Sequence, residues 1–227
     1  MDSAPAQRKS KYAFLTLPNY SLIAVSNAVE PLRMANRVVG QDVYEWSIVS
    51  LDGRPVPASS GLELAPTIAL DKLGRVDILF VCGGINVRDA VTQPLLTALR
   101  RLADRGLALG ALCTGGYALA RAGLLDNYRA TIHWENLQAV REEFPRVRIS
   151  DQVFSIDRER YTCSGGTAPL DLMLNLIQIK LGARVSQLVS EQFVLERVRN
   201  DQDRQYVPLR AQVGVSHRSL IKVAQLM

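Results

Sequence analysis

Short apolar runs alternate with amphipathic segments along most of the chain. Runs of strand length occupy residues 12–17, 44–51, 76–81, 107–112 and 160–163. In the longer segments between them, apolar residues recur every three or four positions, as they do on one face of a helix. This alternation predicts an α/β protein with a doubly wound, mostly parallel sheet flanked by helices and followed by a C-terminal helical tail.

Glycine and proline positions mark where the predicted helices bend and end. Gly106 and Gly182 directly follow two amphipathic segments, as expected of helix C-caps. Pro31 lies inside another such segment, so we expect the helix to break or kink just after Glu30. Glu30 is then either a solvated helix carboxylate or a carboxylate directed at a site. The helices are predicted at about 21–38, 93–105, 133–143 and 170–181.

The pattern divides the chain into three regions. Residues 1–11 are polar and lack the apolar segment of a secretory signal, so we expect a disordered lead-in. Residues 12–182 carry the alternating strands and helices and are expected to form one folded domain. Residues 183–227 form the tail, with an amphipathic helix predicted over 183–199 and a last helix over 218–227 after a polar linker.

Composition narrows the class of protein. The 227 residues are 48% hydrophobic and 22% charged, and no apolar stretch reaches the ~18 residues that a membrane span needs. We therefore expect a cytoplasmic protein. The net charge of +5 comes from the two ends, because residues 12–183 hold 17 basic and 17 acidic side chains. A polyanionic partner is therefore expected at the ends rather than on the neutral body.

Three cysteines share one sequence context. Cys82, Cys113 and Cys163 each stand at the C-terminal end of a predicted strand and are followed closely by a pair of glycines. The carboxyl ends of parallel strands meet at one edge of a sheet, where ligands usually bind. The odd number of cysteines argues against a disulfide framework. The paired ligand spacing of zinc sites is missing from the sequence, so we expect no metal site. We also expect no other cofactor.

The stretch 107–117 predicts a nucleophile elbow. An apolar strand turns sharply at Cys113, and a short helix follows from Tyr117. Such a turn lifts the cysteine above the edge of the sheet and directs free backbone N–H groups toward it. This geometry suits a reactive thiolate, and it equally suits a polar pocket that binds an anion without chemistry.

His133 and Trp134 follow another short strand and are expected near the same edge. A pair of Cys113 and His133 is the minimum arrangement that activates a thiolate, although His133 equally suits a helix cap. Trp134 is either a core residue or an aromatic face for a ligand. Glu135 would point elsewhere on a helix, which leaves the pair without an orienting group.

The run LGALCTGGYALARAGLLDNYRATIHW contains the elbow and the strand that follows it. With this run, the region 12–182 resembles the class I glutamine amidotransferase-like superfamily, in its PfpI-type branch. The resemblance implies the same doubly wound fold. The residues that match the site positions of that branch are Glu30, Gly83, Gly84, Cys113 and His133.

The tail carries a second resemblance. The run SEQFVLERVRNDQDRQ, followed by SLIKVAQLM, is similar to AraC-family transcriptional regulators with this type of N-terminal domain. In such regulators the tail leads into two helix-turn-helix units. Only the first helix of that region is expected here, so contacts with promoter DNA are expected from the region after residue 227. The resemblance also implies a homodimer that does not associate with membranes.

The resemblance further implies a sensor of a small amine rather than an enzyme. The segments HWENL and SGGTAPLDLMLNLI look closest to regulators that respond to glycine betaine, dimethylglycine or carnitine, with arginine-responsive regulators next. A ligand carboxylate is then expected at the backbone near Thr114 and the glycine pair, and the cation at Glu30 and Trp134. The expected ligand-binding residues are Glu30, Gly83, Gly84, Cys113, Thr114, His133 and Trp134.

Two other functions stay open. The elbow is compatible with a cysteine-dependent hydrolase or hydratase of the PfpI type, in which Cys113 acts with Glu30 or His133. A Cys113 of low pKa would also suit a redox sensor. The regulator-like tail and its positive charge favour the ligand sensor, in which Cys113 is a wall of the pocket rather than a nucleophile.

Overall fold

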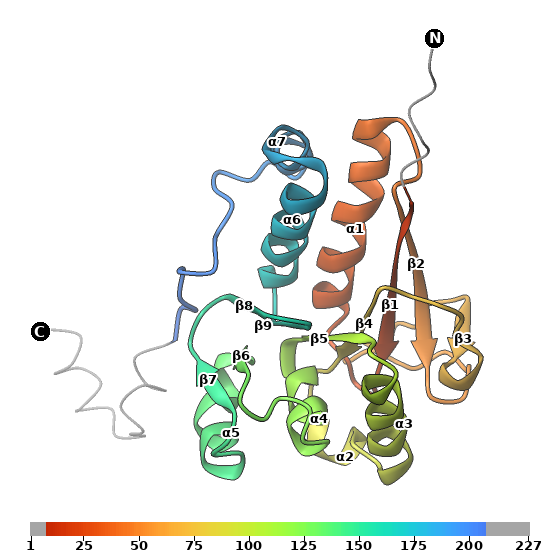
Figure 1. Ribbon diagram of the computed structural model, residues 1–227, viewed down its shortest axis with the longest axis vertical. Coiled ribbons are helices and arrows are strands. Elements are labelled where there is room, and N and C mark those ends of the chain that lie inside the picture. Colours follow the sequence, from red (N-terminus) through yellow and green to blue (C-terminus); the bar gives the residue numbers. More distant parts are fainter. Residues whose placement is uncertain (1–7, 208–227) are drawn as a thin grey trace, which may run out of the picture.

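Seven strands form one twisted sheet in the computed structural model, which describes residues 8–207 (Figure 1). They are β1 (Ser10–Thr16), β2 (Tyr44–Ser50), β3 (Thr67–Ala69), β4 (Ile78–Cys82), β5 (Ala108–Leu112), β8 (Phe154–Asp157) and β9 (Arg160–Cys163). Their order is β3-β2-β1-β4-β5-β9-β8, and only β8 and β9 pair antiparallel. Two further strands, β6 (Arg129–Thr131) and β7 (Arg148–Ser150), form a small parallel sheet.

Helices cover both faces of the large sheet, which confirms the doubly wound fold. The helices are α1 (Leu22–Val39), α2 (Val87–Ala90), α3 (Gln93–Asp104), α4 (Gly116–Arg121), α5 (Leu137–Glu143), α6 (Ala168–Leu181) and α7 (Ala183–Gln192). Three short 3₁₀ segments are η1 (Leu70–Lys72), η2 (Cys113–Gly115) and η3 (Trp134–Asn136). In Figure 1, α1, α6 and α7 pack together on one face, and α2 to α5 lie on the other.

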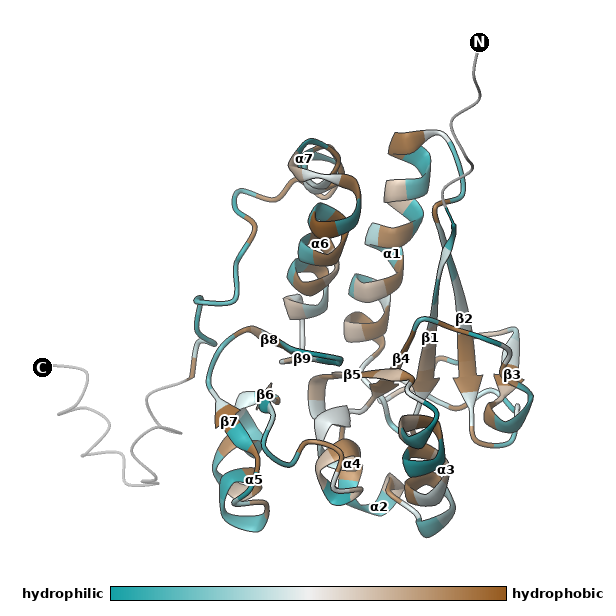
Figure 2. Ribbon diagram, in the orientation of Figure 1, coloured by the Kyte–Doolittle hydropathy of each residue, from teal (hydrophilic) through white to brown (hydrophobic). Residues whose placement is uncertain are grey.

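Each face of the sheet has its own hydrophobic core. Successive side chains of a strand point to opposite faces, so one strand supplies both cores. Phe14 and Phe80 stack with ring centroids 5.5 Å apart in the core under α1 and α6. Their neighbours Leu15 and Val81 belong to the core under α3 and α4. Figure 2 shows the central strands β4 and β5 as mainly hydrophobic, whereas the helices carry hydrophilic residues on their outer faces.

The first helix passes through Pro31 without a break, contrary to the prediction. A proline in a helix interior costs about 3 kcal/mol because it removes a hydrogen bond and crowds the preceding turn. Pro31 and Leu32 are both buried, and burial of apolar surface offsets that cost. Glu30 therefore lies in a regular helix rather than at a discontinuity.

The tail helix is shorter than predicted. α7 ends at Gln192 rather than at 199, because the chain turns at Val194, whose φ is 53°. That left-handed conformation is unfavourable for a β-branched residue and does not continue a helix. The N–H groups of Phe193 and Leu195 both bond to the carbonyl of Ser190 and close the helix.

The start of the described region also differs from the expectation. Residues 8–11, expected in the lead-in, are held to the domain: Ser10 starts β1, Arg8 pairs with Asp77, and Lys9 pairs with Asp42. The helix predicted over 218–227 lies outside the described residues. Within residues 8–207, no helix is both long and apolar enough to cross a membrane. The pattern analysis also missed the short elements β3 and α2.

Candidate functional site

The predicted elbow is present at the end of β5. Cys113 has a φ of 57°, a left-handed conformation that is strained for a residue with a side chain and that often marks functional sites. The chain then continues through η2 into α4. Gly115 is required in this turn, because a Cβ atom there would collide with the carbonyl oxygen of Val81 in β4. The elbow is therefore packed directly against the neighbouring strand.

Cys113 and His133 flank the same glycine. A Cβ atom on Gly165 would lie 2.9 Å from Cys113 Sγ and 2.8 Å from His133 Cδ2. No hydrogen bond joins the thiol to the imidazole within the described residues. Instead, His133 Nδ1 accepts a hydrogen bond from the N–H of Glu135 at 3.5 Å and lies 3.8 Å from the Glu135 carboxylate.

Burial keeps both groups neutral near pH 7. It raises the pKa of the Cys113 thiol to about 11, against the opposing effect of the Thr114 N–H that faces the sulfur. Burial also lowers the pKa of His133, and the nearby Glu135 carboxylate only partly counteracts this effect. The thiolate–imidazolium pair that an activated cysteine requires is therefore disfavoured in this structure.

The elbow opens into a pocket of about 540 Å³ at the carboxyl edge of the sheet. This is the edge at which doubly wound folds usually bind ligands. The loops that follow β1, β2, β4, β5 and β6 supply the walls. Residues with polar groups or exposed backbone on these walls include Ser21, Gly84, Cys113, Thr114, His133 and Glu135.

Gly83 and Gly84, the glycine pair after β4, allow close packing of the loops that follow β1, β4 and β5. A Cβ atom on Gly83 would lie 2.6 Å from Thr114 Oγ1, and one on Gly84 would lie 2.8 Å from the Ser21 nitrogen. The Gly83 N–H donates to the carbonyl of Leu112, and the Thr114 hydroxyl donates to the carbonyl of Gly84 at 2.7 Å. Gly84 lines the pocket, whereas Gly83 is used for loop packing.

Glu30 and Trp134 are not among the residues that line this pocket. The Glu30 carboxylate is paired with Arg33 at 2.6 Å on the surface of α1. Since Ser21 lies at the pocket and α1 rises 1.5 Å per residue, Glu30 is about 13 Å further along the helix axis. Trp134 is half-buried against the core under α3 and α4, with its ring 5.5 Å from that of His133. The structure thus brings together Gly84, Cys113, Thr114 and His133 from the predicted set.

Two carboxylates of the pocket were missed or misplaced by the sequence reasoning. Glu135 lines the pocket beside His133, because residues 134–136 form a 3₁₀ turn rather than the start of an α-helix. Asp89 reaches the pocket from the unpredicted helix α2. Neither carboxylate has a Lys or Arg partner among the described ion pairs. Arg88, also on the wall, is paired with Glu143 at 2.7 Å.

The other two cysteines end the strands on either side of β5. Cys82 and Cys163 end β4 and β9, are buried and unpaired, and have pKa values raised well above the usual range by burial. Within residues 8–207, no group of three or more His, Cys, Asp or Glu side chains has a metal-binding arrangement.

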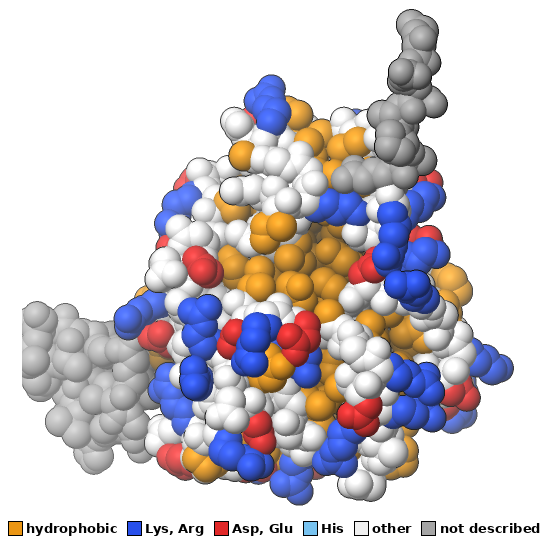
Figure 3. All heavy atoms as spheres, viewed as in Figure 1, with side chains coloured by type: hydrophobic (Ala, Val, Ile, Leu, Met, Phe, Trp, Pro, Cys, Tyr) orange, Lys and Arg blue, Asp and Glu red, His pale blue; other side chains and the backbone are white. Residues whose placement is uncertain are grey.

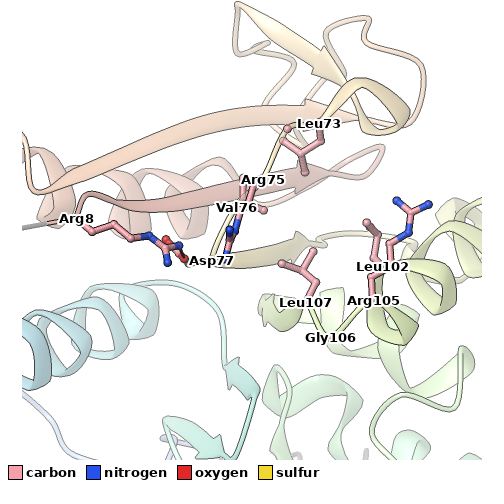
Figure 4. Close-up of a pocket in the computed structure, with 10 residues that line it drawn as sticks. Arg8, Leu73, Arg75, Val76, Asp77, Leu102, Arg105, Gly106 and Leu107 are labelled. Atoms are coloured by element: carbon pink, nitrogen blue, oxygen red, sulfur yellow. Dashed lines mark hydrogen bonds and ion pairs between the residues drawn. The ribbon is translucent and has the colours of Figure 1, made fainter.

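A second pocket, of about 470 Å³, lies at the opposite edge of the sheet (Figure 4). Its walls come from residues just before β4 and β5, and Arg8 points across it toward Asp77. None of the predicted site residues lies there. The elbow pocket is therefore the better candidate for a functional site.

A strained cysteine elbow over a doubly wound sheet, with a histidine beside it, defines an α/β protein of the amidotransferase-like class. A model of the DJ-1/PfpI family matches residues 14–179. The chain belongs to this family.

Comparison with known proteins refines the assignment. The HTH-type transcriptional regulator GbdR of Pseudomonas aeruginosa is 50% identical over 214 residues, which are 94% of this chain and 58% of that protein. The crystal structure of an AraC family transcriptional regulator from Pseudomonas putida superposes with a TM-score of 0.74 at 32% identity, covering 81% of this chain and 99% of that one. The resemblance to AraC-type regulators is thus confirmed, and the chain spans 58% of the length of GbdR.

One similar protein is an enzyme. The isonitrile hydratase of Pseudomonas putida is 33% identical over 142 residues, which are 61% of this chain and 60% of that protein. The fold alone therefore does not separate sensors from enzymes.

Proposed function

We propose that this chain is the ligand-sensing domain of a transcriptional regulator that binds a small amine metabolite in the elbow pocket and controls the genes for its breakdown. The observation that carries the proposal is the 50% identity to an HTH-type regulator along 94% of the chain. The proposed ligands are glycine betaine, dimethylglycine or carnitine, with arginine as the next choice. Promoter DNA would be bound by the region after residue 227.

The pocket wall at Ser21 suits a carboxylate. Ser21 lines the pocket and precedes α1, an 18-residue helix whose first N–H groups and dipole favour an anion. The Ser21 hydroxyl makes no capping bond to the helix and is free to donate to a ligand. The sequence suggests a carboxylate site at the elbow near Thr114. We propose Ser21 instead, because the Thr114 N–H faces the Cys113 sulfur and the Thr114 hydroxyl donates to the carbonyl of Gly84.

The acidic residues of the pocket suit a cation. Asp89 and Glu135 bring two carboxylates to the pocket, and neither is paired with a Lys or Arg within residues 8–207. The exposed side chain of Ile85 and the ring of His133 offer apolar surface for the methyl groups of a quaternary amine. A zwitterion such as glycine betaine would place its carboxylate toward Ser21 and its ammonium group toward Glu135.

Calorimetric titration tests this proposal with glycine betaine, dimethylglycine, carnitine and arginine. Glu135→Gln and Asp89→Asn should each weaken binding by about tenfold or more, as expected for loss of a hydrogen bond or contact to a charged group. Glu30→Gln is the matched control, because Glu30 is paired with Arg33 away from the pocket. Binding that depends on Glu30 and not on Glu135 or Asp89 would overturn this placement of the cation, and no binding of any ligand would overturn the effector class.

A cysteine-dependent hydratase or hydrolase is the second candidate, favoured by the similarity to isonitrile hydratase. Catalysis would require His133 to take the proton of a thiol whose pKa is about 11. Turnover of an isonitrile that is lost in Cys113→Ala would support the enzyme. Ligand binding retained in Cys113→Ser, without turnover in the native chain, would support the sensor.

We also propose that the domain forms a homodimer. Figure 3 shows a broad hydrophobic area at the centre of one side of the molecule, in the region of α1 and α6. Exposed apolar areas of this kind usually mark protein contacts. Light scattering during gel filtration measures the mass directly, and a monomer at high protein concentration would contradict the proposal.

A further inference from the structure

The segment 199–205, which we call the strap, folds back over the domain after α7. In Figure 1 it descends from α7 and passes β8 toward β6 and β7. Each end of the strap is held by a side chain that reaches into the domain. Arg199 holds the first end and Gln205 holds the second.

The first contact joins the strap to the start of α6. The Arg199 guanidinium donates to the Asp171 carboxylate at 2.6 and 2.9 Å, and the Arg199 N–H donates to the same carboxylate at 2.8 Å. The guanidinium also donates to the Thr167 hydroxyl at 2.8 Å. The Asp171 side chain is only 5% exposed, so the strap supplies the charge that this buried carboxylate requires.

The second contact joins the strap to the end of β6. Gln205 Nε2 lies 2.9 Å from the carbonyl oxygen of Ile132 and 3.0 Å from the Thr131 hydroxyl. The Gln205 backbone N–H donates to Asp151, and the carbonyl of Asp203 accepts from Val153. Within residues 8–207, the buried Gln205 Oε1 atom has no hydrogen-bond partner, so the amide is held through its nitrogen alone.

A tight turn separates the two contacts and gives the strap a fixed shape. The Asp203 carboxylate accepts from the N–H of Asn200 at 2.7 Å and pairs with Arg197 at 2.7 Å. The Asn200 side chain accepts from the N–H of Gln202 at 2.8 Å. A displacement at one end of the strap is therefore transmitted to the other rather than absorbed in between.

Both contacts lie next to the wall of the elbow pocket. Ile132 directly precedes His133, and Thr167 follows Gly165, the glycine that packs between His133 and Cys113. The carbonyl of Gly165 accepts the N–H of Ala168 at the start of α6. The strap thus contacts both segments that meet at Gly165, one through Arg199 and the other through Gln205.

We propose that the strap couples the occupancy of the elbow pocket to the position of the chain that follows it. A ligand that displaces His133 or the Gly165 loop weakens or strengthens the contacts of Gln205 and Arg199, and this shifts the tail. The inference rests on the proposed sensor function and identifies the element that carries its output. Coupling between two sites is reciprocal, so release of the strap must also change the pocket.

The first test uses Cys113 as a reporter of the pocket and requires no effector. The chain of 227 residues and its variants Gln205→Ala and Arg199→Gln are treated with iodoacetamide, and peptide mass spectrometry gives the rate at each cysteine. Gln202→Ala is the matched control, since Gln202 is exposed on the same strap and its side chain hydrogen-bonds only to Asp201 within residues 8–207. Cys82 reports general unfolding, because it is buried in the sheet.

Loss of the Gln205 contact should raise the rate at Cys113 about fivefold or more, the lower limit of typical coupling between sites, with the Cys82 rate unchanged. Loss of the Arg199 contact also destabilises the fold, so here the Cys113 rate should rise about fivefold or more relative to the Cys82 rate. Gln202→Ala should behave like the native chain. An unchanged Cys113 rate in both variants would overturn the proposal. A parallel rise at Cys82 would overturn it as well, because the strap would then stabilise the whole fold without acting on the pocket.

The second test adds glycine betaine as the probe. Its dissociation constant should differ between the native chain and Gln205→Ala, and hydrogen exchange at the Gln205 amide should change when it binds. Binding without either effect overturns the strap proposal and leaves the sensor function intact. If glycine betaine does not bind, the choice of effector is wrong, and the alkylation rates still decide whether the strap acts on the pocket.

Discussion

Cys113 and His133 lie against the same glycine, Gly165, yet no hydrogen bond joins their side chains. The imidazole instead faces Glu135, and burial disfavours the charged forms of both the thiol and the ring. A cysteine protease site needs the opposite arrangement, with the thiolate stabilised by a charged histidine. The elbow of this chain therefore has the geometry of a nucleophile site without the electrostatics that an activated thiolate requires.

Gly165→Ala should disturb the pocket more than the rest of the fold. The new methyl group would lie 2.8 Å from His133 Cδ2 and 2.9 Å from Cys113 Sγ, so both side chains must move. We expect a loss of about 1–3 kcal/mol in the free energy of unfolding, as for other overpacked sites, together with weaker ligand binding. Denaturant titration and calorimetry measure the two effects. Gly74→Ala is the matched control, because nothing lies within 4 Å of its added methyl group.

Thr114→Val should loosen the contact between the loops after β4 and β5. The Thr114 hydroxyl donates to the carbonyl of Gly84 at 2.7 Å, and valine has nearly the same shape without a donor. We expect a loss of about 1–2 kcal/mol in the free energy of unfolding, because the Gly84 carbonyl loses its partner. Thr114→Ser keeps the hydroxyl and should lose less stability in the same denaturant titration. A loss in Thr114→Val no larger than that in Thr114→Ser would contradict this role of the hydroxyl, because valine keeps the methyl group that serine lacks.

The reactivity of Cys113 should keep rising at alkaline pH. An unperturbed thiol has a pKa near 8.5, whereas burial raises the pKa of Cys113 to about 11. The alkylation rate at Cys113 should therefore continue to increase above about pH 8.5 and level off near 11. A plateau near neutral pH would show a stabilised thiolate and would favour the enzyme over the sensor.

The same shift predicts how stability depends on pH. The folded pKa of Cys113 is raised, so its contribution to stability is complete below the unfolded thiol value of about 8.5 and is lost as the pH rises toward 11. Denaturant titrations of the native chain and Cys113→Ala over this range should converge as the pH increases. A constant difference between the two would contradict the buried, protonated thiol.

Arg199→Ala should destabilise the folded domain, although Arg199 lies in the predicted tail rather than in the predicted domain of residues 12–182. It leaves the Asp171 carboxylate buried at 5% exposure without its cation, whereas the Arg199 side chain is itself 33% exposed. We expect a loss of about 2 kcal/mol, below the 3–5 kcal/mol seen when a fully buried pair is broken. Thermal unfolding measures the change. Arg146→Ala, which removes the exposed partner of Asp126, should have a much smaller effect.

The fold could be predicted from the sequence because its signals are local. The strands β4 and β5 are buried on both faces and read as continuous apolar runs, and Gly106 and Gly182 mark helix ends by conformations with positive φ. The elbow was predictable for the same reason, since a strand, a cysteine and two glycines are adjacent in the chain.

The site was only partly predictable because it depends on direction and distance. The helical spacing around Glu30 does not tell how far along α1 the pocket lies, and the carboxylate is paired with Arg33 instead. Glu135 was assigned to the wrong side because a 3₁₀ turn was taken for an α-helix. The contact of Arg199 with Asp171 joins residues far apart in the sequence, so no local pattern could show it.

The tightly packed loops after β4 and β5 also limit which substitutions this domain can accept during evolution. Gly83, Gly84 and Gly115 each lie so close to a neighbouring backbone that even a methyl group would collide. New ligand preferences must therefore arise at the rim, from positions such as Ile85 or Glu135 whose side chains have room to change. Related domains that bind different ligands would then keep the three glycines and differ at the exposed positions of the pocket. A library of variants restricted to those exposed positions should therefore yield folded proteins with altered ligand specificity.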